Sequence, residues 1–226
     1  MLITTDTLLG ADPPRSAYLE SYRVLRSSVL ALNEKQPFQT VLVTSPGQGE
    51  GKTSVVTNLG TMLGLVERPT IIADADFYGD GISEKLGIAG QTAGLTDLCL
   101  GQAELEEVLI ATEIPFLHVL SAGTQIDKGP ELAITDSMRQ VLDQLKERAE
   151  FVLLDCTPVS GFGTALSLAG VVDTVFLVSL ARSQATVVRR CLDQLRERGT
   201  NIGGVIVNDV LPSDSAVYRS FHRYYR

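Results

Sequence analysis

Short runs of apolar and β-branched residues recur along the chain and alternate with longer amphipathic stretches. The runs that predict strands are Thr40–Thr44, Thr70–Ala73, Phe116–Leu120, Phe151–Leu154, Thr174–Ser179 and Val205–Val207. Strands that are apolar throughout are typical of a parallel sheet with both faces covered. Their alternation with helices predicts an α/β fold in three layers, with a doubly wound, mostly parallel sheet in the middle.

Apolar residues at spacings of three and four predict the covering helices, which we expect over Ser16–Leu32, residues 104–111, Leu132–Ala149 and Thr186–Arg198. The last helix stops at Gly199, and glycine is the preferred residue just past a helix end. The chain has 226 residues, which fits a single domain, and we place that domain over residues 1–217. We expect a flexible segment at residues 1–14 and a flexible tail at residues 218–226.

Composition narrows the class of protein. The formal net charge is −8, whereas a general nucleic-acid binder needs a basic surface, so we expect no nucleic-acid partner. The three cysteines form no CxxC pair and indicate neither a zinc site nor a disulfide framework. No apolar run approaches the ~20 residues that span a bilayer, and the amino terminus lacks a secretory pattern. We therefore expect a cytoplasmic protein, and binding to a membrane protein stays open.

The segment Ser45–Thr53, with the sequence SPGQGEGKT, carries the strongest chemical signal. It follows a predicted strand and opens a helix, so its glycines let backbone N–H groups surround phosphate oxygens at a helix amino terminus. In this pattern Lys52 reaches the β- and γ-phosphates, and the Thr53 hydroxyl ligates Mg²⁺. An ordinary glycine-rich turn would not need the Gly-Lys-Thr ending. The sequence thus predicts a P-loop NTPase that binds ATP and Mg²⁺ through Gly47, Gln48, Gly49, Glu50, Gly51, Lys52, Thr53 and Ser54.

Polar residues also follow three of the predicted strands, at the sheet edge where parallel sheets place their ligands. Asp74 and Asp76 follow one strand and Asp155 follows another. Alone, such an Asp is more often a helix cap or loop residue. Beside a P-loop, these carboxylates become candidates to hold Mg²⁺ and to accept a proton from an attacking hydroxyl. Asn208 follows the last strand and could read an adenine edge or simply form a turn.

These motifs together resemble those of the bacterial tyrosine kinases of capsule and exopolysaccharide synthesis, which are P-loop proteins related to the MinD/ParA ATPases. The P-loop is similar to the family's Walker A motif, Ile71–Asp76 to its second motif and Val152–Pro158 to its Walker B motif. Further matches are the charged residues of the family's oligomerisation motif and a short version of its terminal tyrosine cluster, here Glu20, Arg23, Arg26, Tyr218, Tyr224 and Tyr225. The resemblance runs from about Ser16 to the end of the chain.

The resemblance implies an ATP-dependent protein-tyrosine autokinase with the catalytic residues Lys52, Asp74, Asp76 and Asp155. Asp74 would be the base, and Mg²⁺ would be held by Thr53, Asp76 and Asp155. The tail residues Tyr218, Tyr224 and Tyr225 would be phosphorylated by a neighbouring copy in a ring-like homo-oligomer joined through Glu20, Arg23 and Arg26. Family members act with a transmembrane chain-length regulator and a cognate tyrosine phosphatase, which would place the protein at the inner face of the cell membrane.

The chain also departs from the family pattern. Tyr78 stands where the second motif continues to an Arg, Thr164–Ala165 stands where an Asp-Ala pair is expected, and the tyrosine cluster is sparse. Two alternatives therefore remain open. One is a nucleotide-binding scaffold of the same family with weak catalysis, and the other is a MinD/ParA-like switch ATPase. The acidic net charge and Gly47, where those ATPases carry a Lys, count against the second.

Overall fold

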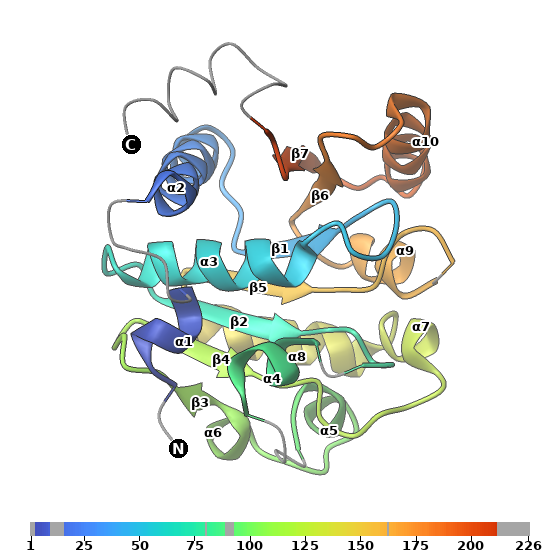
Figure 1. The fold of residues 1–226 in the computed structure, drawn as a ribbon. Helices are drawn as coiled ribbons and strands as arrows, with labels where there is room; N and C mark the ends of the chain where they lie inside the picture. Colours follow the sequence, from blue (N-terminus) through green and yellow to red (C-terminus); the bar gives the residue numbers. More distant parts are fainter. Residues whose placement is uncertain (1–2, 10–15, 80, 89–92, 162, 212–226) are drawn as a thin grey trace.

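The computed structural model describes residues 3–9, 16–79, 81–88, 93–161 and 163–211. Within these residues the strands are β1 (Thr40–Thr44), β2 (Thr70–Asp74), β3 (Ile110–Ala111), β4 (Leu117–Leu120), β5 (Phe151–Asp155), β6 (Thr174–Leu180) and β7 (Ile202–Asn208). They form one sheet in the order β3-β4-β2-β5-β1-β6-β7, which runs from the bottom to the top of Figure 1.

The pairing within this sheet is parallel except between β3 and β4, which are antiparallel. β1 lies between β5 and β6, so that Val41 pairs with Leu153 on one side and with Thr174 on the other. Because β1, β2 and β5 run in the same direction, their carboxyl ends meet at one edge of the sheet. The predicted mostly parallel sheet is confirmed.

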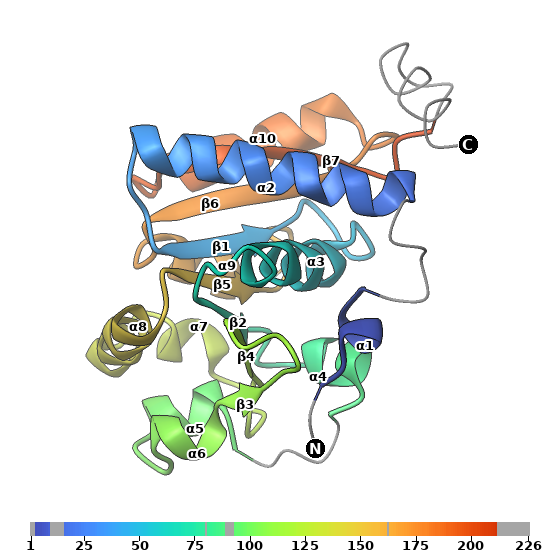
Figure 2. The same ribbon diagram turned by 90° about the vertical axis from the view of Figure 1, so that its left-hand side faces the viewer.

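Helices cover both faces of the sheet, which confirms the three-layer architecture (Figure 1, Figure 2). One face carries α1 (Thr5–Leu9), α2 (Ala17–Lys35), α3 (Lys52–Gly64) and α4 (Gly81–Leu86). The opposite face carries α5 (Leu95–Cys99), α6 (Leu105–Val108), α7 (Gly129–Leu132), α8 (Asp136–Arg148), α9 (Gly163–Ala169) and α10 (Ala185–Arg196).

Alternate side chains of the central strands enter the two opposite cores. In β5, Phe151 and Leu153 pack with the helices of the α3 side, whereas Val152 and Leu154 pack with those of the α8 side. Every residue of β5 is buried. The strand is apolar along its length because it has no face in contact with water.

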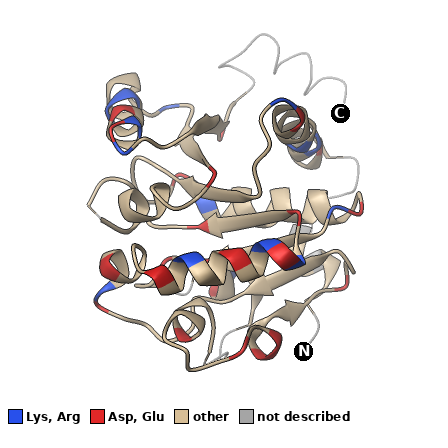
Figure 3. Ribbon diagram, turned by 180° about the vertical axis from the view of Figure 1, so that it is seen from behind, with Lys and Arg blue, Asp and Glu red and all other residues tan. Residues whose placement is uncertain are grey.

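The surface helix α8 shows the amphipathic pattern that its sequence predicts. Its buried residues are Met138, Val141, Leu142 and Leu145. Its outer side carries acidic and basic residues next to one another (Figure 3). Lys146 and Asp143, for example, form an ion pair of 2.5 Å one turn apart. Charges of both signs keep this face hydrated while the apolar stripe packs on the sheet.

Close packing fixes α3, the helix that follows the P-loop, against β2. All its residues from Val55 to Gly64 are buried. A Cβ atom on Gly60 would lie 2.6 Å from Cγ1 of Ile72, closer than two carbon atoms can approach. The absence of a side chain at this position therefore sets the distance between helix and strand, and with it the place of the P-loop above the sheet.

The amino-terminal segment contains structure that the sequence analysis did not predict. We expected a flexible segment at residues 1–14, which stays a prediction, and residues 5–9 form the short helix α1. Ile3 forms a bridge with Thr112, and Ile3 and Leu8 are buried in the core of the α3 side. Burial of these two apolar side chains stabilises a segment too short to show a periodic pattern. Residues 10–14 and the tail at 218–226 lie outside the described residues.

Three predicted boundaries also differ from the structure. The predicted helix Leu132–Ala149 is divided, because the Thr135 hydroxyl accepts a bond from the N–H of Met138 and caps α8. The predicted helix at residues 104–111 ends at Val108, and the next residues pair with β4 as β3. β7 begins at Ile202 rather than Val205. The sequence analysis missed its first half because Gly203 and Gly204 have low strand propensity.

Candidate active site

The P-loop joins the end of β1 to the first turn of α3. Gly49 has φ 73° and Gly51 has φ 93°, in the left-handed region that favours glycine. Gly51 is the residue before the helix, and the N–H of Val55 donates to its carbonyl at 2.9 Å. Lys52 and Thr53 therefore stand in the first turn of α3, where free N–H groups and the helix dipole favour a bound anion. Binding of a phosphate by these residues stays a prediction.

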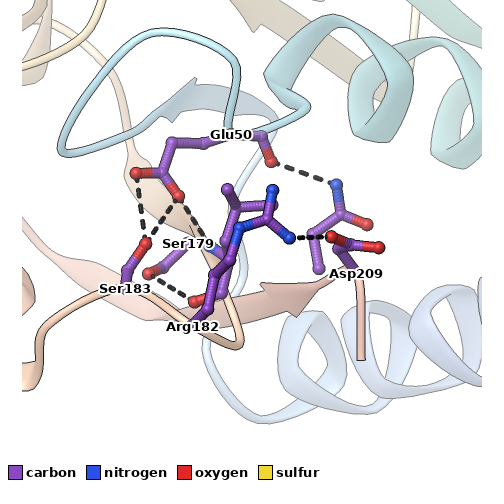
Figure 4. Close-up of polar contacts among 7 residues, drawn as sticks. Glu50, Ser179, Arg182, Ser183 and Asp209 are labelled. Carbon is purple, nitrogen blue, oxygen red and sulfur yellow. Dashed lines mark hydrogen bonds and ion pairs between the residues drawn. The ribbon is translucent and has the colours of Figure 1, made fainter. Parts of the chain in front are cut away.

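Glu50 ties the P-loop to the chain that follows β6 (Figure 4). Its carboxylate accepts a 2.6 Å bond from the N–H of Leu180 and a 3.1 Å bond from the hydroxyl of Ser183. The residue is only 7 % exposed, so these bonds replace water around the buried carboxylate. The Glu50 carboxylate is thus already bonded to β6 and to the loop that follows it. The backbone of Glu50 is the part that remains available to bind a phosphate.

Asn208 supports the same loop from the end of β7. Its side-chain amide donates to the carbonyl of Glu50 at 3.0 Å. A Cβ atom on Gly51 would lie 2.1 Å from the Asn208 amide nitrogen, so this contact needs the glycine. The structure therefore gives Asn208 a bond to the P-loop. Reading of an adenine edge by its remaining groups stays a prediction.

Asp74 and Asp155 face each other as register partners at the ends of β2 and β5. Asp74 is fully buried, and its two carboxylate oxygens accept 3.0 Å bonds from the N–H groups of Asp76 and Ile82. Burial and the negative charge of Asp155 raise the pKa of Asp74 to about 8, despite these two bonds. A carboxylate with this pKa can take up a proton near neutral pH.

Asp155 is the acidic residue in direct contact with the P-loop. It is 3 % exposed, and burial raises its pKa to about 6 although the Thr53 hydroxyl and the charge of Lys52 favour the ionised form. Its Oδ1 atom is buried and has no hydrogen-bond partner among the residues that the structure describes. An unpartnered carboxylate oxygen beside a threonine hydroxyl fits Mg²⁺, which prefers oxygen ligands.

The remaining predicted magnesium ligand, Asp76, is half-buried, and its Oδ1 accepts a bond from the N–H of Tyr78 at 3.2 Å. Within the described residues, no group of three or more His, Cys, Asp or Glu side chains could hold a metal by itself. A magnesium ion here would accordingly need the phosphate oxygens of a nucleotide and water as further ligands. The predicted ligands therefore fit a Mg²⁺ ion that binds together with a nucleotide.

One charged neighbour of the site was missed by the sequence analysis. The ammonium group of Lys85, on α4, donates to the Ser54 hydroxyl at 3.0 Å. Lys85 lies outside every motif considered above, and no periodic pattern marks the short helix that carries it. Only the folded position of α4 brings it to the P-loop.

The predicted oligomerisation residues Glu20, Arg23 and Arg26 lie on α2. Arg23 forms a 2.9 Å ion pair with Glu20. Arg26 instead donates to the carbonyl of Met62 on α3 at 3.4 Å, so this member of the motif also contacts its own domain. The predicted phosphorylation sites Tyr218, Tyr224 and Tyr225 lie outside the described residues.

A groove of about 1080 Å³ opens beside the P-loop, between α2 and β7. Gly49, Ser54 and Asn208 line its end at the P-loop, and apolar residues such as Leu25 and Phe176 line the remainder. This volume is in the upper part of the range of small-molecule sites. Together, the strand, the glycine loop, the following helix and the buried carboxylates define a P-loop NTPase fold.

Comparisons with known proteins place the chain within this class. It matches no protein-family model. It is 26% identical over 198 residues to the tyrosine-protein kinase ptk of Acinetobacter johnsonii, covering 87% of this chain and 27% of that protein. It is 24% identical over 207 residues to the tyrosine-protein kinase CpsD of Streptococcus agalactiae, covering 91% of this chain and 89% of that protein. The chain thus spans about a quarter of the length of several relatives and nearly all of another.

Solved structures agree with this relationship. The kinase domain of the Escherichia coli tyrosine kinase ETK matches with a TM-score of 0.79 and 25% identity, covering 85% of this chain and 75% of that one. The VpsO kinase domain matches with a TM-score of 0.77 and 28% identity, covering 86% and 97%. The Pyrococcus horikoshii MinD structure, at 22% identity and a TM-score of 0.61 over 83% and 86% of the chains, shares the fold.

The chain is therefore a relative of the bacterial tyrosine-protein kinases, as its motifs predict. Among the described residues, no helix is both long and apolar enough to cross a membrane.

Proposed function

We propose that this chain is an ATP- and Mg²⁺-dependent protein-tyrosine kinase. The observation that carries the proposal is the pairing of two buried carboxylates, Asp74 and Asp155, at the ends of adjacent strands, one of them bonded to Thr53 of the P-loop. The relatives named tyrosine-protein kinases support the activity. The MinD neighbour was solved with Mg-ADP, which supports the use of a nucleotide and Mg²⁺.

In this proposal the P-loop amides and Lys52 hold the triphosphate. Thr53, Asp76 and Asp155 hold Mg²⁺ directly or through water, and the ion would neutralise charge on the phosphates. The substrate tyrosine hydroxyl attacks the γ-phosphorus while its proton passes to Asp74. The bond from the γ-phosphorus to the bridging oxygen breaks, and ADP leaves. The raised pKa of Asp74 suits this role because the group must hold the proton it receives.

The proposed substrates are Tyr218, Tyr224 and Tyr225 of a neighbouring copy in a homo-oligomer. By analogy with the resembled family, the enzyme would work at the inner face of the cell membrane with a transmembrane chain-length regulator, and a tyrosine phosphatase would reverse the modification. Its role would be to control capsular or exopolysaccharide synthesis and export. We propose no nucleic-acid partner, since the net charge is −8.

Substitution of Lys52 tests the nucleotide site. Lys52→Ala removes a charge-assisted phosphate contact and should weaken binding of Mg-ATP by about 1.5–3 kcal/mol. Calorimetric titration measures the affinity, and circular dichroism shows whether the variant is folded. A folded variant that binds Mg-ATP as tightly as the parent would contradict the assigned site.

Substitution of Asp74 separates a kinase from a nucleotide-binding scaffold. Asp74→Asn should keep nucleotide binding but abolish transfer to tyrosine, because an amide cannot accept the proton. Mass spectrometry of the parent and the variant, each produced with and without the regulator, measures phosphate on the tail. A parent that binds Mg-ATP yet never carries phosphotyrosine would favour the scaffold. ATP-dependent dimerisation with DNA binding would favour the switch ATPase.

A further inference from the structure

Lys85 is placed at the P-loop by the anchoring of α4. The N–H of Ile82 donates to Asp74 at 3.0 Å, and Ile82 and Leu86 are buried in the core. A Cβ atom on Gly81 would lie 3.5 Å from the Thr53 hydroxyl oxygen and 3.8 Å from Oδ2 of Asp155. The first residue of α4 therefore lies close to the predicted magnesium ligands Thr53 and Asp155, and Lys85 is one turn further along the same short helix.

The ammonium group of Lys85 has an uncharged hydrogen-bond partner. It donates to the Ser54 hydroxyl at 3.0 Å, across 31 residues of sequence. Ser54 directly follows Thr53 in the first turn of α3, at the helix end where phosphates bind. A neutral hydroxyl is a poorer acceptor for an ammonium group than a phosphate oxygen is, since charge-assisted bonds are the stronger ones.

The surroundings of Lys85 favour an anion. Partial desolvation lowers its pKa, and the negative charge of Asp155 acts in the opposite direction and favours its charged form. The carboxylates of Asp74, Asp76 and Asp155 attract cations. The ammonium group of Lys85 repels cations. Within a nucleotide, this ammonium group can bind the phosphate oxygens that do not contact Mg²⁺.

We propose that Lys85 is a second phosphate-binding lysine of the nucleotide site, which contacts the nucleotide phosphates from α4, while Lys52 contacts them from the P-loop. On nucleotide binding, the ammonium group exchanges the Ser54 hydroxyl for a phosphate oxygen. This inference rests on the proposed nucleotide site, but it adds a residue from outside the predicted motifs.

Replacement of Lys85 by Met tests the inference. This variant keeps the length of the side chain and removes its charge. We expect roughly tenfold weaker binding of ADP or of a non-hydrolysable ATP analogue in the presence of Mg²⁺, measured by calorimetry. The loss should shrink at high salt, because part of the contact is electrostatic. The melting temperature without nucleotide should match that of the parent.

Two matched variants control for charge and for the helix. Lys85→Arg keeps a positive group and should retain most of the affinity. Glu84→Gln changes the exposed neighbour on the same helix and should bind like the parent. A loss for both ADP and the ATP analogue assigns the contact to the α- or β-phosphate, whereas a loss for the ATP analogue alone assigns it to the γ-phosphate.

Lys52→Ala distinguishes the possible failures. If Lys52→Ala loses nucleotide binding and Lys85→Met binds both nucleotides as tightly as the parent, the inference on Lys85 is wrong and the nucleotide site stands. If the parent fails to bind either nucleotide, or Lys52→Ala binds like the parent, the proposed site is wrong and the Lys85 inference falls with it.

Discussion

The buried carboxylates around the P-loop differ in how their oxygens are satisfied. Both oxygens of Asp74 accept backbone N–H groups, and Glu50 accepts from Leu180 and Ser183. Asp155 differs because one of its oxygens has no partner within the described part of the chain, although the side chain is almost fully buried. A buried carboxylate oxygen without a hydrogen-bond partner destabilises the fold when no nucleotide is bound. A bound ligand that supplies the missing partner explains why such a group is present.

Asp155→Asn should therefore stabilise the nucleotide-free protein while it weakens magnesium-dependent binding. The amide removes an unsatisfied charge, and we expect a gain of about 1–3 kcal/mol in the free energy of unfolding. The Mg²⁺-dependent part of nucleotide affinity should fall by about 10–100-fold. Thermal unfolding with and without Mg-ADP measures both effects. Two results together would contradict this interpretation of Asp155. The variant would be less stable than the parent without ligand, and Mg-ADP would stabilise it as much as it stabilises the parent.

At the scale of elements, Asp97 joins α5 to the loop that follows β4. Its carboxylate accepts bonds from the N–H of Gly94 at 2.8 Å, the N–H of Thr124 at 3.0 Å and the hydroxyl of Thr124 at 2.7 Å. A Cβ atom on Gly123 would lie 2.2 Å from Oδ2 of Asp97, so the loop closes over the carboxylate only with glycine there. This small network joins the amino-terminal end of α5 to the loop that follows β4.

Asp97→Asn gives a pH-dependent prediction. Burial raises the pKa of Asp97, but the bonds from Thr124 and Gly94 outweigh it and leave the pKa below its usual value. A lowered folded-state pKa contributes stability that is present above the unfolded pKa of about 3.9 and is lost as the pH falls through the folded value. The variant should cost about 1–2 kcal/mol between pH 5 and 7, and less below pH 4.

Urea unfolding of both proteins at several pH values measures this difference. Asp193→Asn is the control, because Asp193 makes an exposed ion pair with Arg196 and should contribute at most about 1 kcal/mol. An equal cost for Asp97→Asn at pH 3.5 and pH 7 would show that the ionised carboxylate is not the stabilising group.

At the scale of the whole molecule, α2 packs on its own domain and also carries the residues that we propose to contact a second copy. Its buried stripe, which includes Leu19, Tyr22 and Val29, packs on α3 and the sheet. Arg26 reaches the Met62 carbonyl of the same domain, whereas Arg23 pairs with Glu20 within α2 itself. The side chain of Arg23 is 36 % exposed, so a second copy can reach it.

Arg23→Glu should weaken the proposed homo-oligomer and leave the domain folded. A like charge beside Glu20 would face the acidic surface of a neighbour, and phosphorylation of tail tyrosines in trans should fall with the assembly. The double variant Arg23→Glu and Arg26→Glu should show the same loss and also a lower melting temperature. Light scattering with Mg-ATP and the regulator's cytoplasmic tail measures the mass. A parent that is already a monomer under these conditions would exclude the ring.

The sequence by itself determined the features that lie within short contiguous segments. The P-loop, the central strands and the stripe of α2 could be predicted because each depends on the conformation of a few neighbouring residues. The short helices α4, α5 and α9 were missed, since they are too short to show a period. The amino-terminal segment was missed because the burial of Ile3 and Leu8 depends on a surface made by other parts of the chain.

Only the tertiary structure decided which side chains meet at the site. Asp74 meets Asp155 because β2 pairs with β5, and no local pattern encodes that strand order. Lys85 reaches Ser54 across 31 residues, and Glu50 reaches Leu180 across 130. Such contacts depend on how all the strands and helices pack together, whereas local sequence restricts only the backbone of each element. The motif residues were therefore visible in the sequence, but the burial and the bonds that give them their chemistry were not.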